Sequence, residues 1–178
     1  MQLINDFQTS VRKAFDEIDP DWEKYNGVVI CGTHSPEKTE EAIEVIRLCR
    51  ESGIPFLGIC AGFQLAAIEW ARHVLGVTDA TSEEFGTGTF VVKKMPGFRV
   101  GIKMSQGGFE NYWHQYTVDI SYLAGLTIFL SEGFADMIKV ADKPFFAVQF
   151  HPEYNSTPDK PHPLLKNFLK SCKEHTHV

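Results

Sequence analysis

The sequence predicts an α/β fold with a mostly parallel central sheet, and two observations support it. Residues 28–31, 54–60 and 144–150 form short apolar runs of the kind found in strands buried on both faces. Between the first two runs lies a segment with helical spacing of apolar residues. The order strand, helix, strand, helix predicts right-handed parallel βαβ units with a buried helix at the centre.

The N-terminal segment is expected to form a surface helix. Its apolar positions recur at helical spacing and are Phe7, Val11, Ala14, Phe15 and Ile18. We expect Asn5 or Asp6 to cap this helix and Pro20 to stop it. Residues 37–51 are acidic at their start and basic toward their end, which predicts a second surface helix closed by Gly53. Residues 61–75 are apolar on most sides and predict a buried helix.

The second half of the chain has the composition of strands. Residues 86–120 are rich in Gly, Thr, Val and aromatics, with turn signals at Pro96-Gly97 and Gly107-Gly108, so short antiparallel strands are expected. Another strand pair is expected at residues 126–130 and 137–140. A helix over residues 163–172 should close the fold, with His175 and His177 in a disordered tail.

Composition limits the function classes. A chain of 178 residues with 43% hydrophobic content fits one globular domain, residues 1–178. Its net charge of −6 and scattered Lys and Arg argue against nucleic acid as a partner. The sequence has no apolar stretch of about 20 residues and no signal pattern, so we expect a soluble, cytoplasmic protein without a membrane partner.

The cysteines and histidines do not suggest a metal site. Four cysteines are widely spaced without a CxxC pair, which predicts neither a zinc knuckle nor a disulfide framework. Three of them, Cys31, Cys49 and Cys172, are expected to be structural thiols. The histidines show no ligand spacing, so no metal or other cofactor is expected.

The fourth cysteine is a candidate nucleophile. Cys60 stands in the sequence Gly58-Ile59-Cys60-Ala61-Gly62, where a buried strand is expected to turn into a buried helix. The two glycines would allow a sharp turn and close packing of the helix against its strand. A thiol at a helix N-terminus favours the reactive thiolate. The alternative is that Cys60 is a small buried hydrophobe, as most single cysteines are.

A matching base follows the third apolar run. His151 should emerge at the carboxyl end of a core strand, and in extended geometry Glu153 would share its face and fix its tautomer. A lone histidine before a proline is more often a loop residue with satisfied hydrogen bonds. Because two strand-end candidates agree with each other, the sequence favours a Cys60, His151 and Glu153 triad.

Both segments resemble a known family. Residues 56–64, FLGICAGFQ, and residues 149–153, QFHPE, resemble the two signatures of class I (triad) glutamine amidotransferases. Residues 67–76, 79–85 and 148–169 are similar to the glutaminase domain of CTP synthase. The resemblance covers roughly residues 26–172 and implies a flavodoxin-like sheet flanked by helices, with a small antiparallel extension.

The resemblance implies a role for each matching residue. Cys60 would form a glutamyl thioester, with His151 moving the proton and Glu153 orienting it. Backbone N–H groups of Ala61 and near Gly32 and Thr33 would form the oxyanion hole. The side chains that would hold the substrate are Gln64, Glu84, Gln115 and Tyr116. Glu84 would bind the glutamine ammonium. If the resemblance is left aside, the favoured interpretation of Glu84 is a solvated carboxylate in a loop.

Two departures from the family pattern bear on the substrate. The oxyanion strand ends in Cys31-Gly32-Thr33-His34-Ser35, where CTP synthases have Pro-Gly-Gly-Phe-Gly. Gln115 stands where the family has an arginine near the glutamine carboxylate. Both changes are expected to alter recognition of the amide donor. His34 would contact that donor or have no role.

Three functions compete. The first is a stand-alone glutaminase that passes ammonia to a separate synthase subunit, because the chain carries no GxxxxGK[ST] phosphate loop and no room for the synthase domain. The second is an independent hydrolase of another γ-glutamyl amide. The third is a non-catalytic regulatory relative, which the three intact reactive side chains argue against.

Overall fold

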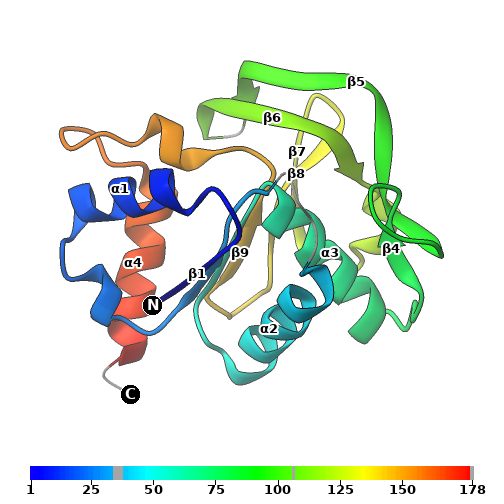
Figure 1. Cartoon of the computed structure of the whole chain (residues 1–178), viewed down its shortest axis with the longest axis horizontal. Helices are drawn as coiled ribbons and strands as arrows, with labels where there is room; N and C mark the ends of the chain where they lie inside the picture. Colours follow the sequence, from blue (N-terminus) through cyan, green and yellow to red (C-terminus); the bar gives the residue numbers. More distant parts are fainter. Residues whose placement is uncertain (34–37, 106, 177–178) are drawn as a thin grey trace.

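A six-stranded sheet runs through the centre of the computed structural model, which describes residues 1–33, 38–105 and 107–176 (Figure 1). The strands lie in the order β1, β2, β3, β9, β8, β7. Their bounds are Gln2–Ile4, Val28–Ile30, Phe56–Ile59, Phe145–Val148, Phe134–Lys139 and Thr127–Ser131. The first four strands are parallel, and β8 and β7 add antiparallel pairs at one edge. The predicted mostly parallel α/β sheet is confirmed.

Helices cover both faces of this sheet (Figure 1). Helices α1 (Gln8–Ile18) and α4 (Pro163–Thr176) pack on one face, where Phe15 stacks on Phe168 with ring centroids 6.1 Å apart. Helices α2 (Thr39–Ser52) and α3 (Ala61–His73) pack on the other face. Because β2 and β3 are wholly buried, both faces of the parallel strands are removed from water, as their apolar sequences require.

A second sheet rises from the end of the first and forms the extension (Figure 1). It consists of β4 (Ala80–Ser82), β5 (Thr89–Ser105) and β6 (Gly108–Val118), with β4 parallel to β5 and β5 antiparallel to β6. The expectation of short strands here is wrong. Pro96-Gly97 is no turn but lies inside β5, where the register with β6 shifts between Lys94 and Arg99. A bulge of this kind accommodates the missing N–H of a proline without ending the strand.

Two smaller corrections concern the helix ends. Helix α1 begins after Phe7 and has no side-chain cap, because Asn5 donates to the Cys31 carbonyl and Asp6 accepts from the Thr33 hydroxyl instead. His175, expected in a disordered tail, lies in the last turn of α4. The predictions for His34, Glu37 and His177 concern residues outside the described part of the chain.

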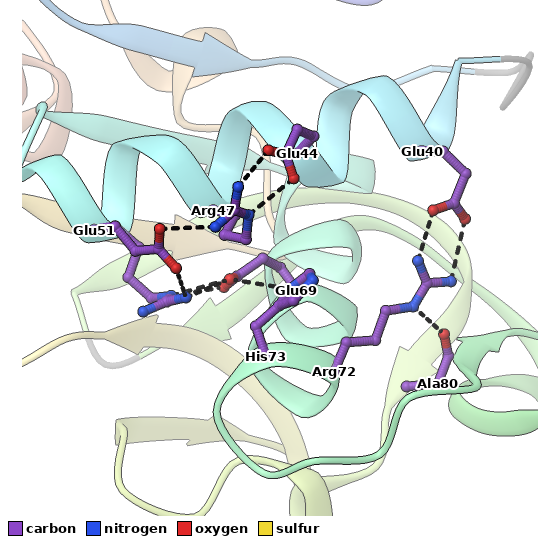
Figure 2. Close-up of polar contacts among 9 residues, drawn as sticks. Glu40, Glu44, Arg47, Glu51, Glu69, Arg72, His73 and Ala80 are labelled. Carbon is purple, nitrogen blue, oxygen red and sulfur yellow. Dashed lines mark hydrogen bonds and ion pairs between the residues drawn. The ribbon is translucent and has the colours of Figure 1, made fainter.

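A buried ion pair holds α2 against α3 (Figure 2). The Glu69 side chain is fully buried and accepts from the Arg50 guanidinium at 2.8 and 3.0 Å. The Arg47 contacts with Glu44 and Glu51, by contrast, lie at the surface of α2 alone. Arg50 therefore joins two helices, whereas Arg47 supports one.

Three 3₁₀ helices complete the described elements, at Trp22–Lys24, Ile120–Tyr122 and Pro152–Asn155. The third follows β9 directly and carries residues of the candidate site. Among the described residues, no helix has the length and apolar character needed to cross a membrane.

Candidate active site

Cys60 lies at the turn between β3 and α3, at the carboxyl end of the parallel strands. Its backbone has φ 54° and ψ −102°, a region that side chains rarely adopt, and its N–H donates to the Val148 carbonyl at 2.8 Å. Such a conformation costs on the order of 1–3 kcal/mol and persists where the surrounding structure enforces it. The turn thus holds the thiol in a fixed position at the sheet edge.

Gly58 and Gly62 permit this turn because neither position has room for a side chain. A Cβ on Gly62 would lie 2.1 Å from the Ile30 carbonyl oxygen, and a Cβ on Gly58 would lie 2.6 Å from the Gly62 carbonyl oxygen. Both distances are well inside van der Waals contact. The predicted use of the two glycines, close packing of the helix start against its strand, is confirmed.

The imidazole of His151 is held by a buried carboxylate. His151 Nδ1 and Glu153 Oε1 are 2.8 Å apart, and both side chains are buried. The expected neighbourhood is correct, but its expected geometry is wrong: Glu153 lies in the 3₁₀ helix Pro152–Asn155 and not in an extended strand. The tight turn brings the two side chains together, and the backbone N–H of His151 donates to the Asn111 carbonyl at 2.8 Å.

Charge around His151 favours its protonated form. Burial of the ring works to lower the pKa of His151, but hydrogen bonds with Cys60 and Glu153 outweigh burial and raise it to about 10. Both Cys60 and Glu153 thus favour a proton on the ring.

A cavity of about 480 Å³ opens over these groups. Eight of the ten residues named from the sequence line it, and they are Thr33, Cys60, Ala61, Gln64, Glu84, Gln115, Tyr116 and His151. Gly32 and Glu153 lie behind this wall. A Cβ on Gly32 would be 3.2 Å from His151 Cε1 and 3.7 Å from Cys60 Cβ, so this glycine packs directly against both reactive side chains.

Gln64 connects the helix to the other side of the cavity. Its amide nitrogen donates to the Tyr116 carbonyl at 3.2 Å and to Gln149 Oε1 at 3.3 Å. The Gln149 amide in turn lies 3.8 Å from Cys60 Sγ. Gln149 was missed as a site residue although it opens the QFHPE segment, because its position in a buried run suggested only a strand.

Two backbone segments lie beside the thiol, the start of α3 and the segment after β2. Ala61 begins α3, so its N–H has no acceptor within the helix. Thr33 follows β2, and its hydroxyl donates to Asp6 Oδ2 at 2.7 Å, which ties this segment to the start of α1. A Thr33 side chain fastened in this way restrains the backbone that replaces the second glycine of the family pattern.

The hairpin contributes a buried histidine that sequence reasoning left without a role. Burial lowers the pKa of His114 to about 4, with repulsion from Arg99 and His151 acting in the same direction and a hydrogen bond to the Tyr116 carbonyl opposing it. Because the ring is neutral and Nδ1 lies 2.8 Å from that carbonyl, Nδ1 carries the hydrogen. His114 thus lines the cavity as an uncharged group.

No arginine replaces the one missing at position 115. Arg99 lies directly opposite His114 in the hairpin, but its guanidinium stacks 3.9 Å from the Tyr112 ring centroid and pairs with Asp136 at 3.6 Å. It therefore anchors the hairpin to β8. Of the residues that line the cavity in the described structure, none is Arg or Lys.

Aromatic side chains at the cavity were also missed, and they are Phe7, Phe98, Trp113 and Tyr154. Phe7 fits a helical apolar pattern, which suggested a core position. The others lie beside motif residues or a turn signal, and nothing in a single sequence indicates that they face a cavity. Across the described ranges, no three His, Cys, Asp or Glu side chains converge as a metal site.

Comparison with known proteins gives the family. The profile of "Glutamine amidotransferase class-I" matches residues 5–171. CTP synthase of Methanospirillum hungatei is 35% identical over 189 residues, covering 88% of this chain and 36% of that protein. CTP synthase of Methanoregula boonei is 34% identical over 180 residues, covering 84% of this chain and 34% of that protein. The chain belongs to the class I glutamine amidotransferases, a family of amide-hydrolysing enzymes.

A solved structure shows the same fold. The Trypanosoma brucei CTPS glutaminase domain with bound acivicin aligns with a TM-score of 0.79 at 20% identity, covering 98% of this chain and 94% of that one. The chain spans about a third of the length of the curated relatives it matches, which are CTP synthases. It corresponds to their glutaminase portion.

Proposed function

We propose that the protein hydrolyses the side-chain amide of glutamine through a thioester on Cys60 and supplies the ammonia to a synthase. One observation carries this proposal: the thiol sits on a strained turn beside an imidazole that a buried carboxylate holds in place. Membership in the amidotransferase family supports the reaction class.

The reaction begins from a thiolate and an imidazolium. The Cys60 thiolate attacks the amide carbon, and the N–H of Ala61 with those near Gly32 and Thr33 stabilises the oxyanion. The C–N bond then breaks as His151 gives its proton to the leaving nitrogen, and ammonia departs. Water attacks the thioester, one of its protons passes to His151, and the C–S bond breaks to release glutamate. Glu153 keeps the ring oriented through both steps.

The polar wall of the cavity supports recognition of the amino-acid end. Glu84 offers a negative charge to the substrate ammonium, Gln64 offers its side-chain oxygen as an acceptor, and Gln115 offers a neutral amide donor. The substrate carboxylate meets no arginine or lysine among the lining residues. Neutral donors bind a carboxylate less strongly than a guanidinium does, so we expect weak affinity for free glutamine.

A synthase is the proposed consumer of the ammonia. The relatives named CTP synthase extend well beyond the segment that this chain matches. Ammonia is a small product that escapes to water unless a second site takes it up. We therefore expect glutamine hydrolysis to accelerate when a synthase partner is bound and its own substrates are present.

The test is ammonia release from glutamine by the purified protein and by four variants. Cys60→Ser should have no detectable activity, and the matched control Cys49→Ala, at a buried thiol of α2, should keep it. His151→Ala should lose roughly 10³-fold or more, and Glu153→Ala roughly 10- to 100-fold, because an orienting group matters less than the group that moves the proton. Retention of activity in Cys60→Ser would overturn the proposal.

A further inference from the structure

The cavity is lined by polar and by aromatic side chains. The polar side chains come from four parts of the fold: Thr33 follows β2, Gln64 lies in α3, Glu84 follows β4 and Gln115 lies in β6. Among the aromatic side chains are those of Phe7, Phe98, Trp113 and Tyr154. Cavities of roughly 300–1,000 Å³ enclose ligands of drug size, and glutamine is smaller than these. The volume of about 480 Å³ therefore leaves space beyond the amino-acid end of the substrate.

Two of these aromatic rings pack on His151. The Tyr154 ring lies 5.3 Å from the His151 ring at an interplanar angle of 30°, and the Phe7 ring meets the same ring edge-on at 6.1 Å. The Trp113 carbonyl lies 3.7 Å from Cys60 Sγ, and the Trp113 ring meets Phe98 at 6.2 Å. The rings of Phe7 and Tyr154 therefore border His151, and the backbone of Trp113 borders Cys60.

The direction of proton transfer places the leaving group beside His151. Glu153 occupies His151 Nδ1, so Nε2 is the nitrogen that serves the reaction. The nitrogen that leaves must approach Nε2 to receive a proton as the C–N bond breaks. A substituent on that nitrogen would consequently lie in the cavity that the aromatic side chains line together with Cys60 and His151.

These rings are also open to water. Phe98 is 56% exposed, Trp113 55% and Tyr154 51%. An apolar group in the substrate would cover them and gain from the removal of apolar surface from water. Ammonia, the leaving group from glutamine, is too small and too polar to do so.

We propose that the site also hydrolyses γ-glutamyl amides whose nitrogen carries an apolar, aromatic substituent, and that Phe98 and Trp113 hold this substituent. This inference rests on the proposed amide hydrolysis at Cys60. The Cys60 Sγ–C bond forms and the C–N bond breaks, His151 protonates the departing amine, and water then cleaves the thioester. Amide and water give glutamate and a free amine, with no other reactant.

The experiment compares three substrates with the purified full chain: glutamine, γ-glutamyl methylamide and γ-glutamyl benzylamide. The two substituted amides have leaving amines of similar chemistry and differ in one ring. We expect kcat/KM for the benzylamide to exceed that for the methylamide by about tenfold or more, the order of discrimination that an apolar subsite provides. Equal values would overturn the inference.

Hairpin variants locate the effect. Phe98→Ala and Trp113→Ala should each lower the benzylamide-to-methylamide ratio of kcat/KM several-fold. The matched control is Ile102→Ala, because Ile102 is exposed on the same hairpin face, two residues from the Trp113 partner Val100, and does not line the cavity. It should leave the ratio unchanged. An unaltered ratio in both cavity variants would overturn the assignment of the two rings.

The pattern across substrates separates this inference from the proposed function. Hydrolysis of glutamine with neither substituted amide accepted would overturn the inference and leave the glutaminase intact. Hydrolysis of the benzylamide without glutamine would support the inference and overturn glutamine as the donor. Failure of all three substrates would overturn both.

Discussion

The central sheet and the β5–β6 hairpin differ in what they bury. Strands β2 and β3 are apolar and buried on both faces; Cys60 follows β3 directly, and its backbone N–H donates to the carbonyl at the end of β9. The hairpin buries polar groups such as Arg99 and His114 on its inner face and exposes apolar side chains such as Ile102 and Phe109 on its outer face. The sheet thus positions the reacting atoms, whereas the hairpin sets the chemical character of the cavity mouth.

The sharpest way to break this comparison is to add one methyl group to Gly62, which packs against β2 of the sheet, and one to Gly97, which lies in the hairpin. Gly62→Ala should destabilise the protein by about 4 kcal/mol or prevent folding, because its Cβ would lie 2.1 Å from a backbone oxygen that cannot move freely. Gly97→Ala, in the hairpin, should change the free energy of unfolding by less than about 0.5 kcal/mol, since nothing lies within 4 Å of its Cβ. Urea denaturation measures the free energy of unfolding of both variants. Equal losses would contradict the claim that the sheet is packed more tightly than the hairpin.

The ion pairs of Figure 2 test the same comparison in α2 and α3, the helices that cover one face of the sheet. Arg50→Ala leaves the buried Glu69 carboxylate without its guanidinium and should cost about 3 kcal/mol. Arg47→Ala removes surface contacts on one helix and should cost at most about 1 kcal/mol. Thermal and urea unfolding of the two variants tests this, and a larger loss for Arg47→Ala would contradict the clamp between α2 and α3.

On the hairpin side, the buried His114 makes stability depend on pH. Its pKa is about 4 in the folded protein, whereas an ordinary histidine has a pKa of 6.5. Between these two pH values the unfolded chain therefore binds a proton that the folded protein rejects. Stability from this source is present above pH 6.5 and is lost as the pH falls toward 4. Relative to His114→Gln, the native protein should lose about 2–3 kcal/mol between pH 7 and pH 4. Parallel stability curves for the two proteins would contradict a neutral, buried ring.

The smallest predicted effect comes from a substitution that adds a cation to the cavity. Gln115→Arg should lower KM for glutamine by about tenfold with kcat little changed, because a guanidinium binds the substrate carboxylate more strongly than an amide does. The control Gln115→Met has similar length and no charge and should not lower KM. Steady-state kinetics measures both. An unchanged KM in Gln115→Arg would show that the carboxylate binds elsewhere.

The sheet could be predicted from sequence because its physical requirements are local. A parallel strand buried on both faces must be apolar throughout, as residues 28–30 and 56–59 are. The turn at Cys60 was equally predictable, since only glycine fits at positions 58 and 62. These local patterns were enough to predict Cys60 and His151 as site residues and to predict the βαβ order. None of these predictions required knowledge of contacts between distant parts of the chain.

The hairpin and the aromatic wall could not be predicted in the same way. Pro96-Gly97 is a normal turn signal, and only pairing with a distant strand keeps β5 continuous through it. The apolar residues that alternate along β5 lie on the face exposed to solvent. The alternation that usually identifies the buried face of a strand therefore predicts the wrong face here. Phe7 reaches the cavity because the chain before α1 packs against Gly32, a contact that no local pattern contains.

Covalent labelling of the native protein tests the central claim, a nucleophilic thiol at Cys60, most directly. Burial raises the pKa of Cys31 to about 12, of Cys49 to about 11 and of Cys172 to about 12, so these three remain unreactive thiols. A glutamine-like diazoketone, followed by peptide mass mapping, should modify Cys60 alone and abolish ammonia release in proportion to labelling. Modification of another cysteine with Cys60 untouched, or full activity after complete labelling of Cys60, would contradict the claim.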